Sequence, residues 1–155
     1  MFNNSKVDEI LNYIVLNEIK PCGLGSRDTL RLEASLPLYG FELSEQISPV
    51  EANLKWVLTN DNDYLGKNII DNEVDSGNHK ILKKFVIDSK KIARSGTKVK
   101  NNDINGVVTS GNYSPILEKS IGFVLFDSSP QSDLIEFDIR GKFIEGNIIN
   151  KRFLS

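Results

Sequence analysis

The spacing of apolar residues changes once along this chain, close to residue 78, and the change limits the folds open to it. Before residue 78, apolar side chains recur at helical spacing, as in Val7, Leu11 and Ile14. After residue 78 they alternate with polar side chains, as strands with one buried face require. The sequence therefore predicts an α+β protein in which a helical segment, residues 1–78, precedes a β-rich segment, residues 79–155.

The clearest helix start in the first segment is Ser48-Pro49-Val50-Glu51. It places a capping residue, then proline at the first helical position, then glutamate at the third. Trp56 occupies a core-like position, and Leu65, Ile69 and Ile70 are expected to face inward. Helices are expected over residues 6–18, over 27–34, from 48 onward, and over 66–73.

The second segment is expected to contain only short strands. Because no helix separates them, a small antiparallel β-barrel or a distorted jelly roll is the expected architecture. Asn105-Gly106 and Arg140-Gly141 have the composition of tight hairpin turns. The strands are expected over residues 82–88, 97–100, 106–110, 120–126, 134–139 and 143–149.

The helical segment has amphipathic stripes but almost no strands for them to cover. A helix must bury its apolar stripe against a second layer. Two arrangements satisfy this requirement. Either the helices pack on one another as a small bundle, or the sheet that they cover lies in sequence outside these 155 residues.

Composition excludes several classes of protein. The formal net charge is −2 and no basic run occurs, so we expect neither nucleic acid nor a membrane as partner. No apolar stretch approaches the roughly 20 residues of a membrane span, and the first residues lack the pattern of a signal peptide. Cys22 is the single cysteine, which makes a reducing cytoplasm the simplest location.

The usual catalytic sets are missing from the sequence. His79 is the only histidine and Cys22 the only cysteine. His79 lies in a polar loop and Cys22 stands alone, so the sequence gives no thiol–imidazole pair, no Ser-His-Asp triad and no usual zinc set. We therefore expect no catalytic residue and no metal ligand in this chain, with His79 as a solvated loop residue.

Arg27 is the residue most suggestive of binding. Gly23-Leu24-Gly25 leads into the second predicted helix, with Ser26 in the place of its N-cap. A cation in the first turn opposes the helix dipole, so Arg27 does not serve helix stability. Its guanidinium can form a fork to a carboxylate or to a planar polar ring. The alternative is a structural ion pair between Arg27 and a nearby acid, with Arg31 as a surface residue.

A second candidate segment is Thr109-Ser110-Gly111, where a predicted strand runs into a turn rich in hydroxyl groups. These hydroxyls could line a ligand cleft. The pattern alone favours a turn whose Thr and Ser side chains satisfy its own backbone groups. Arg94, before Ser95-Gly96, is interpreted as structural.

Several blocks of residues, in one order along the chain, resemble the signature of the glycine cleavage T-protein family. The longest block runs from Pro21 to Ala34 and includes Gly23-Leu24-Gly25-Ser26-Arg27. Together the blocks cover roughly residues 5–153. The others are Leu36-Pro37-Leu38-Tyr39-Gly40, Ile47-Ser48-Pro49-Val50-Glu51-Ala52, Tyr64-Leu65-Gly66-Lys67 and Val108-Thr109-Ser110-Gly111.

The resemblance implies an activity. Members of this family are aminomethyltransferases that take the aminomethyl group carried on the lipoyl arm of the H-protein. They transfer its carbon to tetrahydrofolate and release ammonia, which leaves methylenetetrahydrofolate and a reduced lipoyl group. Tetrahydrofolate is therefore the implied cofactor, and the lipoylated H-protein is the implied partner.

The resemblance also implies a division of the chain. Residues 1–78 would be the C-terminal tail of the folate-binding ferredoxin-like domain plus a linker, and residues 79–155 the C-terminal β-barrel domain. Arg27 matches the family arginine that contacts folate or substrate. Ser35 stands where the family usually has glycine. The catalytic aspartate and the glutamate of the family's Thr-Gly-Glu motif have no counterpart here.

Three hypotheses follow for the chain as a whole. The first is the C-terminal part of an aminomethyltransferase that works with a separately encoded N-terminal half. The second is an inactive relic of a split gene. The third is a folate-binding or assembly module without catalytic activity.

Overall fold

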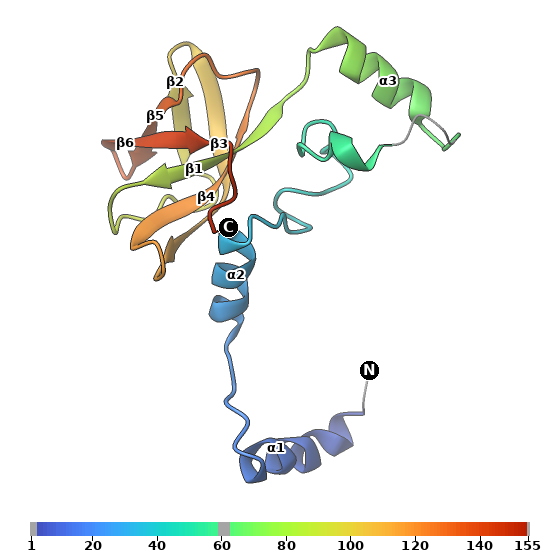
Figure 1. Ribbon diagram of the computed structural model, residues 1–155, viewed down its shortest axis with the longest axis vertical. Helices are drawn as coiled ribbons and strands as arrows, with labels where there is room; N and C mark the ends of the chain where they lie inside the picture. The colour runs from blue at the N-terminus through green and yellow to red at the C-terminus, as the bar shows by residue number, and fades with distance from the viewer. Residues whose placement is uncertain (1–2, 59–62, 155) are drawn as a thin grey trace.

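A computed structural model describes residues 3–58 and 63–154 of the chain (Figure 1). It confirms the α+β class, because the first part is helical and the second is a closed antiparallel barrel. The barrel closes in the strand order β1-β4-β3-β2-β5-β6. Its strands are β1 (Ile81–Ile87), β2 (Lys98–Asn101), β3 (Ile104–Ser114), β4 (Lys119–Phe126), β5 (Leu134–Ile139) and β6 (Lys142–Ile149).

The barrel interior is filled by alternate side chains of the strands, as the sequence pattern predicts. Phe85 and Phe137 are fully buried, with ring centroids 4.6 Å apart. Glycine lets the strands approach closely on this core. A Cβ atom at Gly111 would lie 1.9 Å from the carbonyl oxygen of Ala93, and one at Gly122 would lie 2.1 Å from that of Ser110. The closed shape therefore depends on the absence of a side chain at both positions.

One of the two predicted hairpin turns is confirmed. Arg140 and Gly141 both have positive φ, 56° and 77°, as a two-residue turn between β5 and β6 requires. The prediction for Asn105-Gly106 is wrong, because both residues lie inside β3. The β2–β3 turn falls earlier, where Asn102 has φ 54°.

The helices are α1 (Val7–Leu16), α2 (Leu24–Glu33) and α3 (Lys67–Ser76). The helix predicted from Ser48 does not form. Its capping box is present, since the Glu51 amide donates to Ser48 Oγ at 3.1 Å and the Ser48 amide donates to Glu51 Oε2 at 3.1 Å. Asn53 then takes a left-handed conformation, φ 58°, and the segment ends as a turn. The predicted capping box is therefore present, but only a single turn follows it and no helix forms.

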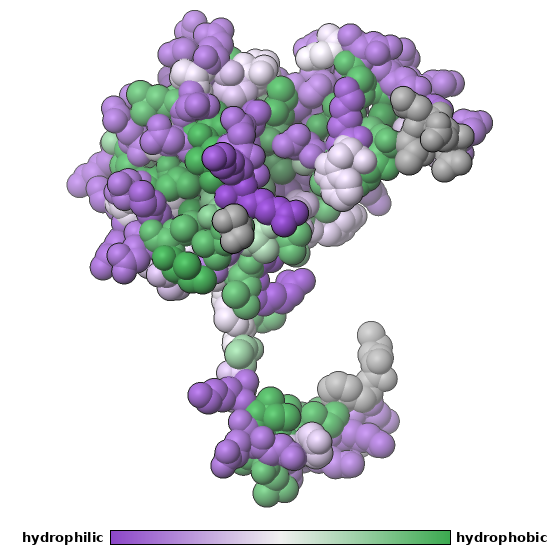
Figure 2. All heavy atoms as spheres, viewed as in Figure 1, coloured by the Kyte–Doolittle hydropathy of each residue, from purple (hydrophilic) through white to green (hydrophobic). Residues whose placement is uncertain are grey.

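Several apolar side chains of the helical segment face solvent, contrary to prediction. Trp56 is 80% exposed, Ile69 72% and Leu65 fully. α1 buries no residue at all and lies away from the barrel, joined to α2 by an extended segment (Figure 1). In Figure 2 it is a separate lobe on which apolar side chains are visible at the surface. The helices therefore do not form the small bundle that was one of the two expected arrangements.

Each of these helices has ten residues. Within residues 3–58 and 63–154, no helix is both long and apolar enough to cross a membrane.

Candidate functional site

The helix that carries Arg27 docks on the strand that carries Thr109 and Ser110, so the two candidate motifs lie side by side. Thr29 Oγ1 of α2 accepts a hydrogen bond from the side-chain nitrogen Nδ2 of Asn112 at 3.0 Å. Ser114 Oγ of β3 donates to Glu33 Oε1 at 2.5 Å, and both residues are buried. The interpretation of Thr109 and Ser110 as a self-satisfied turn is therefore wrong, because both belong to a strand that binds α2 and the segment after it.

Arg31, and not Arg27, forms the ion pairs of α2. Its side chain is 10% exposed, so the prediction of a surface residue is wrong. The guanidinium lies 2.8 Å from Asp28 Oδ1 and 2.9 Å from Glu42 Oε2, and it donates to Ser110 Oγ at 2.8 Å. A planar guanidinium has enough donors to serve all three partners at once.

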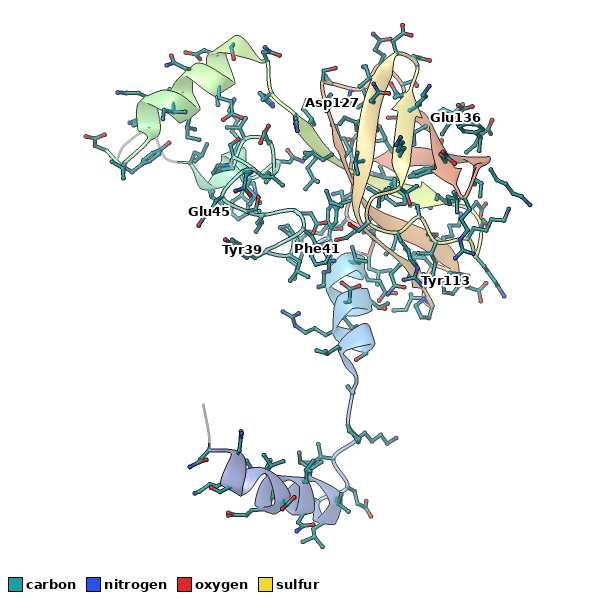
Figure 3. The ribbon with its side chains drawn as sticks, turned by 180° about the vertical axis from the view of Figure 1, so that it is seen from behind. Tyr39, Phe41, Glu45, Tyr113, Asp127 and Glu136 are labelled. Atoms are coloured by element: carbon teal, nitrogen blue, oxygen red, sulfur yellow. The ribbon has the colours of Figure 1, made fainter. Side chains whose placement is uncertain are left out.

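Glu42, which was not among the residues selected from the sequence, connects the segment after α2 to the barrel. Its side chain is completely buried. Besides Arg31, Glu42 Oε2 accepts from the Leu38 amide at 3.0 Å, and Oε1 accepts from Thr109 Oγ1 at 2.6 Å. The β3–β4 register shifts between Val108 and Ser110, and this bulge includes Thr109. Figure 3 shows Tyr39 and Phe41 on the segment that Glu42 holds.

The end of the described chain passes over the C-terminal end of α2. Ser35 has φ 60°, a left-handed conformation that favours glycine. Its hydroxyl accepts a hydrogen bond from the Phe153 amide at 3.1 Å, and Glu33 O accepts one from the Leu154 amide. Residues 153 and 154 are thus fixed against α2.

A concave site of about 280 Å³ lies between this segment, the segment 52–56 and the barrel. Lys83 and Lys84 of β1 and Arg152 line it together with Trp56, so it combines three cations with an exposed indole. Partial burial, and then the charges of Arg152 and Lys83, lower the pKa of Lys84. Positive charges held this close together favour an anionic ligand.

Arg27 lies on the exposed side of α2, beside a second concave site of about 520 Å³. Cys22, Leu24 and Leu36 also line that site, and Leu36 lines the cationic site as well. The two sites are therefore neighbours. No ion pair or hydrogen bond engages the Arg27 guanidinium in residues 3–58 and 63–154, so its donors face solvent and the structural ion pair that was the alternative is not formed.

His79 and Cys22 each lie close to a neighbouring backbone carbonyl oxygen. His79 Nδ1 lies 2.8 Å from the Lys80 carbonyl oxygen, and Cys22 is an exposed free thiol. In the part of the chain that the structure describes, no three His, Cys, Asp or Glu side chains are placed to hold a metal ion.

Comparison with known proteins places both halves of the chain in one family. Residues 4–62 match the family model described as the GCVT N-terminal domain, and residues 80–154 match the glycine cleavage T-protein C-terminal barrel domain. The chain is 42% identical to the aminomethyltransferase of Thermosipho melanesiensis over 86% of its length, which is 37% of that relative. It is 37% identical to the aminomethyltransferase of Alkaliphilus oremlandii over 97% of its length, which is 43% of that relative.

The fold agrees with these matches. The chain superposes on the crystal structure of the glycine cleavage system aminomethyltransferase T from Bartonella henselae with a TM-score of 0.81. The superposition covers 97% of this chain and 44% of the Bartonella henselae chain. The sequence identity is 21%, so this similarity shows the fold alone. The barrel and the helix docked on it are thus those of an aminomethyltransferase fold. This chain belongs to the glycine cleavage T-protein family and spans about two fifths of the length of the curated relatives that it matches.

Proposed function

We propose that this chain is the C-terminal part of a folate-dependent aminomethyltransferase of the glycine cleavage system and that it supplies a tetrahydrofolate-binding surface. The observation that carries the proposal is the pair of neighbouring concave sites that share Leu36. One contains an exposed indole with three cations, and the other contains the Arg27 guanidinium, which has no partner among residues 3–58 and 63–154. A long ligand with planar rings and an anionic end suits such a surface.

The side chains present match the chemistry of tetrahydrofolate. Trp56 offers an apolar face against which a ring can stack. Lys84 and Arg152 can pair with the carboxylates of the glutamate part, since charge-assisted hydrogen bonds are the strong ones. Arg27 can contact a planar polar group through its fork. On this proposal Arg27 is a binding residue and takes no part in proton transfer.

The transfer reaction itself needs an acidic side chain in addition to the aromatic and cationic side chains of these two sites. Transfer of the aminomethyl carbon develops positive, iminium-like charge, and an acidic side chain must lie close to stabilise it. The buried Glu33 and Glu42 are engaged by Ser114 and by Arg31 with Thr109, so neither faces a ligand. We therefore propose that the catalytic acids belong to an N-terminal part, on the same polypeptide or a separate one, and that the lipoylated H-protein delivers the aminomethyl group.

Two further assignments complete the proposal. Residues 1–78 would be the C-terminal tail of the folate-binding domain plus a linker, and residues 79–155 the barrel domain. An exposed free thiol at Cys22 suits a reducing compartment such as the cytoplasm.

Calorimetric titration of the chain with tetrahydrofolate tests the binding surface. We expect Arg27→Ala to weaken binding by about tenfold, the loss of one charge-assisted contact of about 1.4 kcal/mol. Arg94→Ala is the matched control, because Arg94 is also exposed and lines a different concave site. Equal affinity in wild type and Arg27→Ala would remove Arg27 from the site. No binding by a folded chain would favour the inactive relic.

A further inference from the structure

The β5–β6 hairpin and the segment that follows β1 line a third concave site, of about 400 Å³, at one end of the barrel. Its place follows from the strand register, because Ile139 ends β5, Lys142 begins β6 and the two residues are paired. The mouths of β-barrels are common places for small ligands to bind. This barrel-end site shares no lining residue with the two sites proposed for folate, so it is a separate feature of the chain.

The apolar residues of the barrel-end site lie deeper than its charged residues. Ile139 and Ile144 are half-buried and pack against the barrel core, and Ile92 is half-buried as well. The site thus has an apolar floor and a cationic rim. The rim residues are all exposed, and they are Lys91, Arg94, Arg140 and Lys142.

The charges of this rim are not neutralised by the protein. Within residues 3–58 and 63–154, none of the four cations forms an ion pair and no Asp or Glu side chain lines the site. The hairpin carboxylate of Asp138 instead accepts a hydrogen bond from the Gly141 amide at 2.8 Å, which holds the turn. Four like charges around one small site repel one another, so an anion bound among them is attracted by all of them.

The backbone that carries the cations is held in place by the barrel. Ala93 is completely buried, and its carbonyl oxygen lies so close to Gly111 that no side chain could fit there. The next carbonyl oxygen, of Arg94, accepts a hydrogen bond from the Thr97 amide at 3.0 Å. A site whose backbone is already ordered loses less conformational entropy when a ligand binds.

We propose that the barrel-end site binds a small organic anion that has an apolar body and at least two negative charges. The apolar body covers the three isoleucine side chains of the floor. The guanidinium groups of Arg94 and Arg140 pair with the charged groups through charge-assisted hydrogen bonds, and the two lysines add to the attraction. Carboxylates and phosphates share this chemistry, so the class includes linear dicarboxylates and nucleotides.

Isothermal titration calorimetry of the chain without folate tests this site with three probes, which are ADP, suberate and inorganic phosphate. ADP and suberate join anionic groups to a larger organic body, which inorganic phosphate lacks. We expect ADP or suberate to bind at least about tenfold more tightly than inorganic phosphate, because the body of the probe covers apolar surface. Lys91→Gln combined with Lys142→Gln should weaken that binding by about tenfold or more. Lys100→Gln is the matched control, since Lys100 is an exposed cation of β2 that does not line the site.

The outcomes separate the two kinds of anion and decide the inference. Tight binding of ADP, of suberate or of both would support the site and would show which anionic group it prefers. Two results would overturn the inference. The first is that neither probe binds more tightly than inorganic phosphate. The second is that the double variant, with the thermal unfolding of the wild type, binds the probe as tightly as the wild type does. Because no folate and no turnover are involved, both results are independent of the proposed function.

Discussion

The buried carboxylate of Glu42 should be the largest single contributor to the docking of α2 on the barrel. Replacing Glu42 by alanine removes the ion pair with Arg31 and the acceptors of the Leu38 amide and Thr109 hydroxyl. Replacing it by glutamine keeps the volume but removes the charge. The amide oxygen of glutamine can still serve Arg31 and the Leu38 amide, while the Thr109 hydroxyl can rotate to accept from the NH₂ group.

The magnitude follows from burial and from the partners that remain. Removing one partner of a buried ion pair costs about 3–5 kcal/mol. Arg31 keeps Asp28, whose side chain is 42% exposed, so the lower end of that range applies. Adding about 1 kcal/mol for the unsatisfied Leu38 amide gives about 4 kcal/mol for Glu42→Ala. Glu42→Gln should cost about 2 kcal/mol, because uncharged hydrogen bonds are about half as strong.

Thermal unfolding followed by circular dichroism checks these values. For a chain of this length about 4 kcal/mol corresponds to a fall in Tm of roughly 8–16 °C. The control is Asp28→Asn, which removes the exposed partner of the same arginine and should cost less than about 1 kcal/mol. Hydrogen exchange should show faster exchange in α2 than in the barrel for Glu42→Ala. Equal stability losses for Glu42→Ala and Asp28→Asn would refute the reasoning.

Two further predictions follow from single positions. Gly111→Ala should destabilise the barrel by about 3 kcal/mol in urea denaturation, because its Cβ would lie 1.9 Å from the Ala93 carbonyl oxygen; Gly25→Ala has open space within α2 and should be neutral or slightly stabilising. The pKa of Lys84 is lowered in the fold from its ordinary value of 10.5, so the unfolded chain binds more protons just below pH 10.5 and stability should rise with pH there. Lys84→Met should abolish that rise, and an unchanged pH profile would show that Lys84 is not its source.

The barrel could be predicted from the sequence because its signal is local. In strands such as Leu134–Ile139, alternating apolar residues mark one buried face, and each strand lies within a few residues of its predicted position. The predicted turn at Asn105-Gly106 was wrong because Gly106 lies within β3. Its missing side chain lets the Phe126 ring pack closely on it inside the barrel.

The contacts at the α2 surface could not be predicted in the same way. Arg31 and Ser110 are separated by 79 positions, so no local pattern relates them. The one available signal for Glu42 was its place between Phe41 and Leu43, a charge among apolar residues. Trp56 was assigned to the core from its core-like position in the sequence, but a sequence pattern cannot tell which surface covers an indole. Arg27 takes part in none of the ion pairs among the described residues, and its contact with folate stays a prediction.

The most direct test of the central claim is an assay of aminomethyl transfer from H-protein to tetrahydrofolate. It compares the chain alone with a chimera in which the N-terminal part of the Thermosipho melanesiensis aminomethyltransferase precedes this chain. The account predicts no methylenetetrahydrofolate from the chain alone, turnover by the chimera, and reduced turnover in the chimera with Arg27→Ala. Robust turnover by the chain alone, or none by a folded chimera, would contradict it.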